Sequence, residues 1–312
     1  KGVRQEVILE NVHAPYEAFR NRENLGIYHT VAEVEAEVLQ VAAEFPHIVK
    51  HEVMGTTYEG RTIHGLKITD NPLQDEEGEA PIFFMGSVHS REWIANEVPM
   101  ALIHHLVNNY GKDERVTRLV NEREIWIVPA VNLDGMHWSQ TEYKMWRKSR
   151  RDNGDGTFGV DCNRNWGYQW GGPGASASTS SDTYRGPHAF SEPCIAAMRD
   201  LVKREKFVAC CDYHSYSELV LWPWGHKYDD PEDAEVFALH GGAMAKLMGG
   251  YTPEQASDLY PCSGVSADWF YGEMGMLCFT YEFGKQFVPY ESDVPEICQN
   301  GVAAALYFLE NC

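Results

Sequence analysis

The sequence contains no apolar run long enough to cross a bilayer, no Cys-x-x-Cys pair and no Gly-x-Ser-x-Gly motif. A membrane helix needs about 20 consecutive apolar residues, whereas the longest apolar stretches, 98–103 and 302–309, are much shorter. The missing cysteine pair argues against a zinc knuckle or a thioredoxin-type redox site. The missing glycine–serine motif removes the main sequence support for a serine hydrolase. We therefore expect a soluble chain with no membrane partner.

Basic residues are also scarce. The 312 residues include 26 Lys and Arg against 46 Asp and Glu, so the formal net charge at pH 7 is -20. A charge of this sign repels phosphate backbones and anionic lipid, and we expect no nucleic acid partner. Hydrophobic residues make up 44% of the chain, which is enough to bury a substantial core and argues against intrinsic disorder.

The eight cysteines do not reveal a disulfide framework. Cys210, Cys211 and Cys278 lie in apolar, strand-like runs, where a buried free thiol is the expected state. The other five could pair, in an order that their spacing does not fix. They are Cys162, Cys194, Cys262, Cys298 and Cys312.

Helical and strand-like patterns alternate along the chain. Thr30 and Glu33 form a capping-box pattern, which predicts a helix over 30–44. Strand-like runs cover 63–68, 81–88, 124–130, 207–213 and 276–282, and helical runs cover 92–109, 192–205, 231–247 and 294–309. This alternation predicts the α/β class, as a single domain with a mixed, largely parallel twisted β-sheet flanked by helices on both faces. We interpret residues 1–26 as an N-terminal extension and 27–312 as the domain.

Three predicted strands lead into residues that can bind a metal or move a proton. Strand 81–88 runs into His89-Ser-Arg-Glu92, strand 207–213 runs into His214, and strand 276–282 ends in Glu282. Ligands collect at the carboxyl ends of the strands in such sheets, so these side chains can meet. Two histidines and one carboxylate leave zinc an open position, as in catalytic sites, and Glu282 is placed to act as a general base. A His-x-x-Glu pair alone is more often an ordinary surface pair, and the shared location at strand ends favours a metal site without deciding it.

The same residues belong to longer segments that resemble the zinc carboxypeptidases of the pancreatic A/B type, with a closer likeness to bacterial members such as carboxypeptidase T. The order and intervals of these segments agree with that family from about Tyr28 to the C-terminus. The segments include His89-Ser-Arg-Glu-Trp93, Trp146-Arg-Lys-Ser-Arg150, Asp161-Cys-Asn-Arg-Asn-Trp166, Thr183-Tyr-Arg-Gly186, His214-Ser-Tyr216 and Phe279-Thr-Tyr-Glu282.

The resemblance implies one Zn2+ per chain, bound by His89, Glu92 and His214. It further implies that Glu282 activates a water molecule and passes the proton to the leaving amine. Arg147 matches the position that polarises the scissile carbonyl and stabilises the oxyanion, a role suited to a fixed charge.

Five other positions match residues that bind substrate in this family. Asn163 and Arg164 match the pair that holds the terminal carboxylate, which a planar guanidinium binds with two hydrogen bonds. Tyr260 matches the mobile tyrosine that closes over that carboxylate. Arg91 and Tyr216 match positions that line the approach for residues upstream of the cut. The resemblance therefore implies release of single residues from peptide or protein C-termini.

The side-chain preference follows from the pocket that receives the departing residue. In the family its floor corresponds to Val265 and Ala267, and neither is charged. A charged side chain buried there without a partner would cost several kcal/mol, so we predict neutral, apolar or aromatic departing residues. The other predicted pocket residues are Leu221, Gln255, Cys262 and Thr280.

The family habit implies further expectations and leaves two alternatives open. We expect a secreted monomer, a mature form from which a pro-domain has been removed, and that pro-domain or a protein inhibitor as partner. One alternative is a zinc amidohydrolase of the same fold that acts on small acyl-amino acids or cell-wall peptides. The other is a peptide-binding protein without catalysis, which should lack Glu282 or a zinc ligand.

Overall fold

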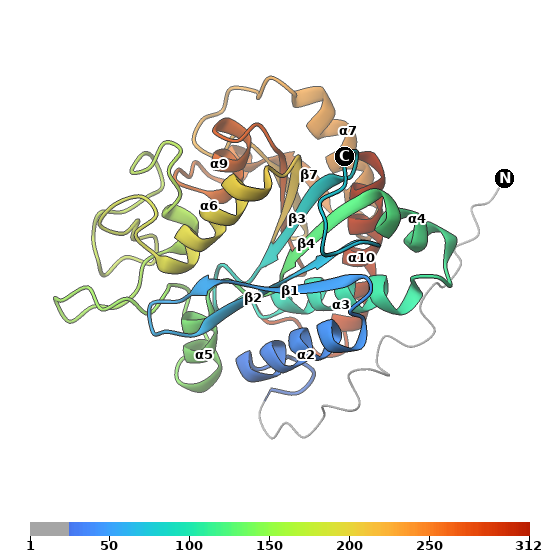
Figure 1. The fold of residues 1–312 in the computed structure, drawn as a ribbon. Coiled ribbons are helices and arrows are strands. Elements are labelled where there is room, and N and C mark those ends of the chain that lie inside the picture. The colour runs from blue at the N-terminus through green and yellow to red at the C-terminus, as the bar shows by residue number, and fades with distance from the viewer. Residues whose placement is uncertain (1–24) are drawn as a thin grey trace.

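The computed structural model describes residues 25–312, so nearly all of the predicted N-terminal extension lies outside the described residues. A single eight-stranded sheet crosses the molecule in the order β1-β2-β4-β3-β5-β8-β6-β7 (Figure 1). The strands are β1 Val49–Thr56, β2 Thr62–Ile68, β3 Ala80–Gly86, β4 Arg123–Val128, β5 Ala209–His214, β6 Leu219–Trp222, β7 Thr252–Gln255 and β8 Leu277–Glu282.

The sheet is mixed, with a parallel centre. Strands β4, β3, β5 and β8 run parallel to one another, whereas β1, β2 and β6 join their neighbours β2, β4 and β8 in antiparallel pairs. Strand β7 adds a parallel pair at the far edge. The predicted α/β class with a mixed, largely parallel sheet is therefore confirmed.

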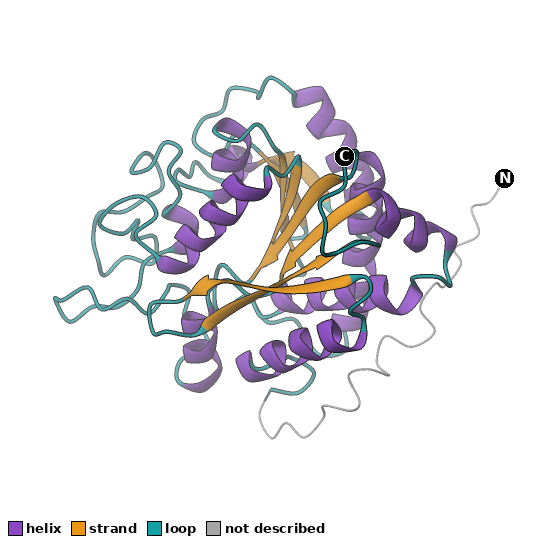
Figure 2. Ribbon diagram, viewed as in Figure 1, coloured by secondary structure: helices purple, strands orange, loops and turns teal. Residues whose placement is uncertain are grey.

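Helices cover both faces of the sheet (Figure 2). Helices α3 and α10 pack against each other on one face, and α6 and α9 lie on the other (Figure 1). The helices are α2 Val31–Glu44, α3 Ile94–Asn109, α4 Glu114–Glu122, α5 Leu133–Thr141, α6 Pro193–Glu205, α7 Ala234–Leu247, α8 Ala256–Leu259, α9 Ser266–Gly272 and α10 Val294–Asn311, and a 3-10 turn, η1, spans Cys162–Arg164. In residues 25–312 no helix combines the length and the apolar character that crossing a membrane requires.

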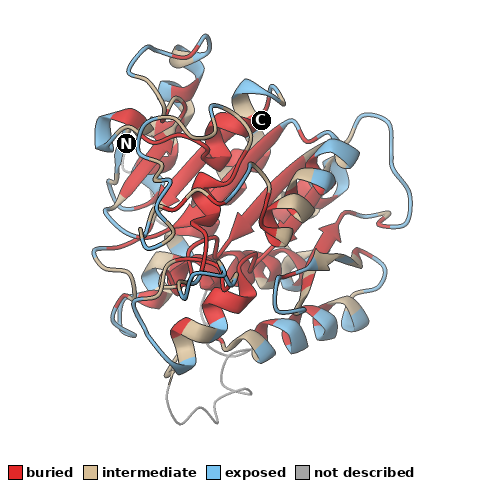
Figure 3. Cartoon of the chain, turned by 90° about the vertical axis from the view of Figure 1, so that its left-hand side faces the viewer, coloured by how far each residue is buried: buried red, intermediate tan, exposed pale blue. Residues whose placement is uncertain are grey.

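The central strands are buried along nearly their whole length (Figure 3). Every residue of β5 is buried, including Asp212 and His214. Parallel strands with helices on both faces lose solvent contact on both sides, so their sequences read as continuous apolar runs. The polar residues that interrupt such a run must therefore find partners inside the protein.

The predicted helix after Thr30 is present, with the capping box that its sequence indicates. The Thr30 hydroxyl accepts a hydrogen bond from the backbone N–H of Glu33 at 3.2 Å, and the Glu33 carboxylate accepts one from the backbone N–H of Thr30 at 2.7 Å. The other predicted elements begin and end within three residues of their predicted bounds. All eight cysteines lie in the described part of the chain and are free thiols. The sulfurs of Cys162 and Cys194 approach to 3.9 Å.

Candidate active site

The parallel strands bring the three predicted strand ends to one edge of the sheet. His214 and Glu282 are directly paired in the register of β5 and β8, and β3 lies on the other side of β5. After β3 the chain turns sharply onto α3, and glycine at position 86 permits this close approach, since a Cβ there would collide with the carbonyl oxygen of Ala95. This turn places His89 and Glu92 beside His214, and it makes α3 begin at Ile94, two residues later than predicted.

His89, Glu92 and His214, which we call the metal set, converge on one point. Each offers one ligand atom, and these atoms lie within 4.8 Å of one another. The Nδ1 atoms of His89 and His214 are 3.1 Å apart, and each lies 2.9 Å from a different oxygen of Glu92. A cation at this point would accept a lone pair from each of the three side chains, and nitrogen and carboxylate oxygen ligands suit zinc. The residues present therefore fit a zinc ion.

The outer nitrogen of each imidazole faces an aspartate. His89 Nε2 lies 3.0 Å from Asp161 Oδ1, and His214 Nε2 lies 3.1 Å from Asp212 Oδ2. An Nε2–H that donates to a carboxylate leaves the Nδ1 lone pair facing the metal position. Neither aspartate was assigned a role from the sequence. A charged residue inside the apolar run of β5 was the available signal for Asp212.

Asp161 also holds Arg147 in place. The Nε and Nη2 atoms of Arg147 donate to Asp161 Oδ2 at 3.1 Å and 3.0 Å. Burial alone would raise the pKa of Asp161, but the positive charge of Arg147 and the hydrogen bond with His89 outweigh it and hold this pKa well below its usual range. Asp161 therefore stays ionised and fixes the Arg147 guanidinium close to Glu92, with the Nη1 atom 3.8 Å from Oε1.

Glu282 is a buried carboxyl group beside the metal set. Burial, reinforced by the negative charge of Glu92, raises the pKa of Glu282 to about 8. A divalent cation at the metal set would lower this pKa, because a nearby positive charge favours the carboxylate. A carboxyl group whose pKa lies near neutrality is suited to proton transfer.

One cavity of about 250 Å³ connects these groups with the predicted substrate-binding residues. Every predicted site residue except Gln255 lines it. They are His89, Glu92, His214, Glu282, Arg147, Asn163, Arg164, Tyr260, Arg91, Tyr216, Leu221, Cys262, Val265, Ala267 and Thr280.

Gln255 does not line the cavity, and its side chain instead supports the surrounding backbone. Its buried side-chain amide donates to the backbone carbonyls of Trp224 at 3.2 Å and Lys227 at 3.0 Å, and to the Ser257 hydroxyl at 2.8 Å. These bonds tie the end of β7 to the loop after β6. Gln255 was predicted as a pocket residue, and it is not among the residues that line this cavity, because the direction of its side chain depends on these long-range partners.

Asn163 and Arg164 belong to η1 and line the cavity. Asn163 Oδ1 accepts a hydrogen bond from the backbone N–H of Ser266 at 2.8 Å, and the backbone N–H of Asn163 donates to Asp161 Oδ1 at 3.0 Å. Arg164 Nε donates to the carbonyl of Gly174 at 3.0 Å, and its guanidinium lies 5.9 Å from the centre of the Tyr260 ring. Tyr260 is half exposed at the cavity mouth.

An aromatic platform forms the outer side of the cavity. The Arg91 guanidinium lies 4.1 Å from the centre of the Phe287 ring, and the ring of Tyr216 meets Phe287 edge-on at 4.8 Å between centroids. Phe287 was not identified from the sequence. It lies in a loop after β8, where no periodic pattern distinguishes it from other aromatic residues.

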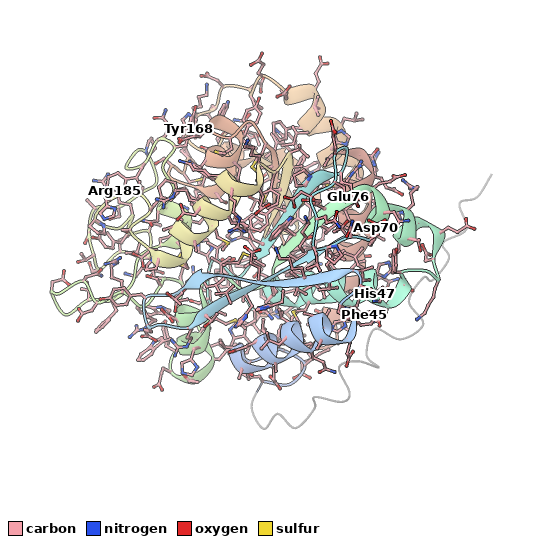
Figure 4. The ribbon with its side chains drawn as sticks, viewed as in Figure 1. Phe45, His47, Asp70, Glu76, Tyr168 and Arg185 are labelled. Carbon is pink, nitrogen blue, oxygen red and sulfur yellow. The ribbon has the colours of Figure 1, made fainter. Side chains whose placement is uncertain are left out.

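Within residues 25–312 a second set of potential metal ligands consists of Asp70, Glu76 and Glu79. Asp70 and Glu76 are exposed and lie between β2 and β3, at the end of β3 opposite the metal set (Figure 4). Exposed carboxylates that are close together are common on acidic proteins and do not by themselves indicate a metal site. The buried set at the cavity is therefore the candidate centre.

Comparison with known proteins agrees with this site. The family model of zinc carboxypeptidases matches residues 34–304. Rat carboxypeptidase A2 is 35% identical over 257 residues, covering 80% of this chain and 60% of the rat protein. A zinc carboxypeptidase of Saccharothrix mutabilis is 33% identical over 305 residues, covering 90% of this chain and 69% of that protein.

A solved structure supports the same assignment. Bovine thrombin-activatable fibrinolysis inhibitor, in complex with a tick carboxypeptidase inhibitor, superposes with a TM-score of 0.83 at 26% identity, covering 91% of this chain and 96% of that one. The family match spans most of the chain and includes the metal set, Arg147, the η1 turn and Glu282. The chain belongs to the zinc carboxypeptidase family.

Proposed function

We propose that the protein is a zinc-dependent exopeptidase that hydrolyses the C-terminal peptide bond and releases single amino acids with neutral, apolar or aromatic side chains. The observation that carries this proposal is the shared cavity, which is lined by the metal set and Glu282 together with Asn163 and Arg164. A metal set alone would fit many hydrolases. The Arg164 guanidinium within the same cavity selects substrates that carry a carboxylate at the chain end.

Zinc held by the metal set would supply Lewis-acid chemistry and make a water molecule more acidic. Glu282 takes the proton from the attacking water and later gives it to the leaving amine. Arg147, fixed by Asp161, stabilises the negative charge that develops on the carbonyl oxygen of the scissile bond. Because Asp161 already holds the Arg147 guanidinium in place, this side chain needs to move little when the negative charge develops.

The pocket for the departing side chain extends from Arg164 to a wall without charged groups. Val265 and Ala267 are each 5% exposed at this wall, beside Leu221, Cys262 and Thr280. The carboxylate, guanidinium and imidazole groups that line the cavity lie elsewhere. They belong to the metal set, Glu282, Arg147, Arg91 and Arg164. An uncharged wall favours apolar side chains because a buried unpaired charge is expensive.

The remaining proposals concern the whole protein. We propose that residues 27–312 form the catalytic domain, that the domain acts as a secreted monomer, and that peptide or protein C-termini are its substrates. A protein inhibitor is a fitting partner, since the bovine relative is in complex with a tick carboxypeptidase inhibitor.

Hydrolysis of blocked dipeptides, before and after zinc chelation, tests the reaction class. Chelation should abolish cleavage and zinc should restore it, and amidation of the peptide terminus should prevent it. Glu282→Gln should bind zinc normally and lose roughly 100- to 10,000-fold in kcat, the range that a general base contributes. Cleavage of amidated peptides at the rate of free acids would refute the exopeptidase proposal, and full activity of Glu282→Gln would remove this residue from the mechanism.

A panel of otherwise identical peptides ending in Phe, Leu, Lys and Glu tests the side-chain preference. We expect the highest kcat/KM for Phe and Leu. Ala267→Asp should shift the preference toward Lys, because it places a negative charge on the pocket wall. Faster turnover of Lys than of Phe and Leu by the wild-type protein would contradict the predicted preference.

A further inference from the structure

We propose that Asp212, held by Ser266, is a positioning carboxylate for the predicted zinc ligand His214, and that this pair links the metal set to the side-chain pocket. The inference rests on the proposed function, because it requires zinc at the metal set. It concerns how the protein retains zinc and how the metal set and the pocket are coupled.

Asp212 lies two residues before His214 on β5, so both side chains point to the same face of the sheet. Its Oδ2 atom is 3.1 Å from His214 Nε2 and also accepts a hydrogen bond from the Ser266 hydroxyl. Asp212 is 0% exposed. Its other oxygen, Oδ1, is buried without a hydrogen-bond partner among the described residues.

The two aspartates behind the metal set differ in how their charge is balanced. Asp161 receives hydrogen bonds from the Arg147 guanidinium and from the backbone N–H of Asn163 in addition to its contact with His89. Among the described residues, the partners of Asp212 are an imidazole and a hydroxyl. A buried carboxylate with so few partners is unfavourable unless a positive charge lies close to it. A divalent cation bound by His214 supplies that charge through the ring, which is why this arrangement points to a role in holding the metal.

Ser266 extends this contact to the pocket. It is the first residue of α9 and separates Val265 from Ala267, the two residues of the predicted pocket floor. Its backbone N–H donates to Asn163 Oδ1, and Asn163 Nδ2 lies 3.5 Å from His214 Nε2. Ser266 thus bonds to Asp212 through its hydroxyl and to Asn163 through its backbone N–H, whereas Asn163 Nδ2 and the Nε2–H of His214 are both donors and form no hydrogen bond. Through Ser266 the position of α9 is linked to Asp212, and so to the orientation of a metal ligand.

Zinc affinity, measured by competition with a chromophoric chelator, tests the proposal independently of activity. Asp212→Asn should raise the zinc dissociation constant roughly 10- to 100-fold, the usual loss when the outer hydrogen-bond partner of a ligand is removed. Ser266→Ala should raise it by a smaller factor. The double variant should bind zinc no more weakly than Asp212→Asn, because Ser266 acts through Asp212.

Asp268→Asn is the matched control. Asp268 is also fully buried and bonded to a histidine, with Oδ2 2.7 Å from His226 Nδ1, but His226 is not part of the metal set. This variant should lose stability and keep the zinc dissociation constant of the wild type. Equal zinc affinities of wild type and Asp212→Asn, or an equal loss in Asp268→Asn, would overturn the proposal.

If Asp212→Asn does not fold, Ser266→Ala still decides, since a zinc dissociation constant equal to that of the wild type would refute the link. These results are separable from those on the proposed function. A wild-type protein that neither binds zinc nor cleaves peptides would refute the function itself. A zinc-binding wild type with an unaffected Asp212→Asn variant would refute only the role of Asp212.

Discussion

Within residues 25–312, histidine and glutamate side chains meet in two largely buried clusters. The metal set lines the cavity at the carboxyl ends of β3 and β5. The second, which we call the closed cluster, consists of His29, Glu37, Glu97 and His104 and joins the segment before α2 to α2 and α3. The two clusters have the same residue types, and all their members except the half-buried His104 are buried, so the difference between them lies in the direction of the lone pairs.

In the closed cluster each ring nitrogen of His29 faces a carboxylate. Nδ1 lies 2.6 Å from Glu97 and Nε2 lies 2.9 Å from Glu37, which also contacts His104. Burial lowers the pKa of His29, but the charges and hydrogen bonds of Glu97 and Glu37 outweigh it and raise this pKa to about 10. His29 is therefore an imidazolium that neutralises carboxylates and has no lone pair for a metal. In the metal set the carboxylates behind the rings leave two inner lone pairs available.

The largest difference between the clusters should appear when one glutamate is neutralised in each. Glu92→Gln removes a ligand, so zinc affinity should fall by more than roughly 100-fold, beyond the usual loss of an outer partner, and activity should fall with it. Glu37→Gln should leave zinc affinity unchanged and lower the free energy of unfolding by about 1–3 kcal/mol, the cost of an unsatisfied buried group. Zinc titration and denaturant unfolding of both variants measure these effects. Similar zinc losses in the two variants would contradict the distinction.

The residues that carry chemistry were predictable from the sequence because strand ends concentrate them. His89, His214 and Glu282 each follow or end an apolar run, and the topology of a parallel sheet then brings them together. The side chains that support them were not predictable in this way. Asp161 lies in a turn, and its contacts with His89 and Arg147 join segments 72 and 14 residues away in the chain.

Dependence on distant parts of the chain also explains the missed secondary structure. Strand β7 is the sequence Thr-Pro-Glu-Gln, which has no strand-like alternation and, in the part of the chain that the structure describes, pairs only with the short β6. Strand β1 at the other edge is mostly half-buried, so its apolar signal is weak. Edge strands such as these are defined by the backbone of their neighbours more than by their own side chains. Strand β6 and the short helices α4, α5, α8 and α9 were missed as well.

The pH dependence of stability should separate the closed cluster from the metal set. The pKa of His29 is raised from 6.5 to about 10, so its contribution is fully present below pH 6.5 and is lost as the pH rises toward 10. The hydrogen bonds of His104 and His29 outweigh burial and lower the pKa of Glu37 from 4.5 to about 2, so its contribution is present above pH 4.5 and is lost below it. Denaturant unfolding of wild type and His29→Gln, from acidic pH to pH 10, measures the contributions of His29 and Glu37 to stability.

The free-energy difference between wild type and His29→Gln should therefore be greatest between about pH 4.5 and 6.5 and shrink on either side. Zinc binding also depends on pH, because the ligands must be deprotonated. Taking the difference between two proteins with the same metal set removes that dependence. A difference that stays constant up to pH 10 would show that His29 is not held as an imidazolium.

The smallest change concerns the capping box that starts α2, which begins two residues after His29. Thr30→Ala removes the side-chain oxygen that accepts from the Glu33 N–H, and it should lower the free energy of unfolding by about 1 kcal/mol. Thr30→Ser keeps that oxygen and should lose much less. Because α2 carries Glu37 into the closed cluster, the effect should appear in denaturant unfolding and leave the zinc dissociation constant unchanged. Equal losses in the two variants would mean that the methyl group of Thr30, and not its hydroxyl, stabilises this end of the helix.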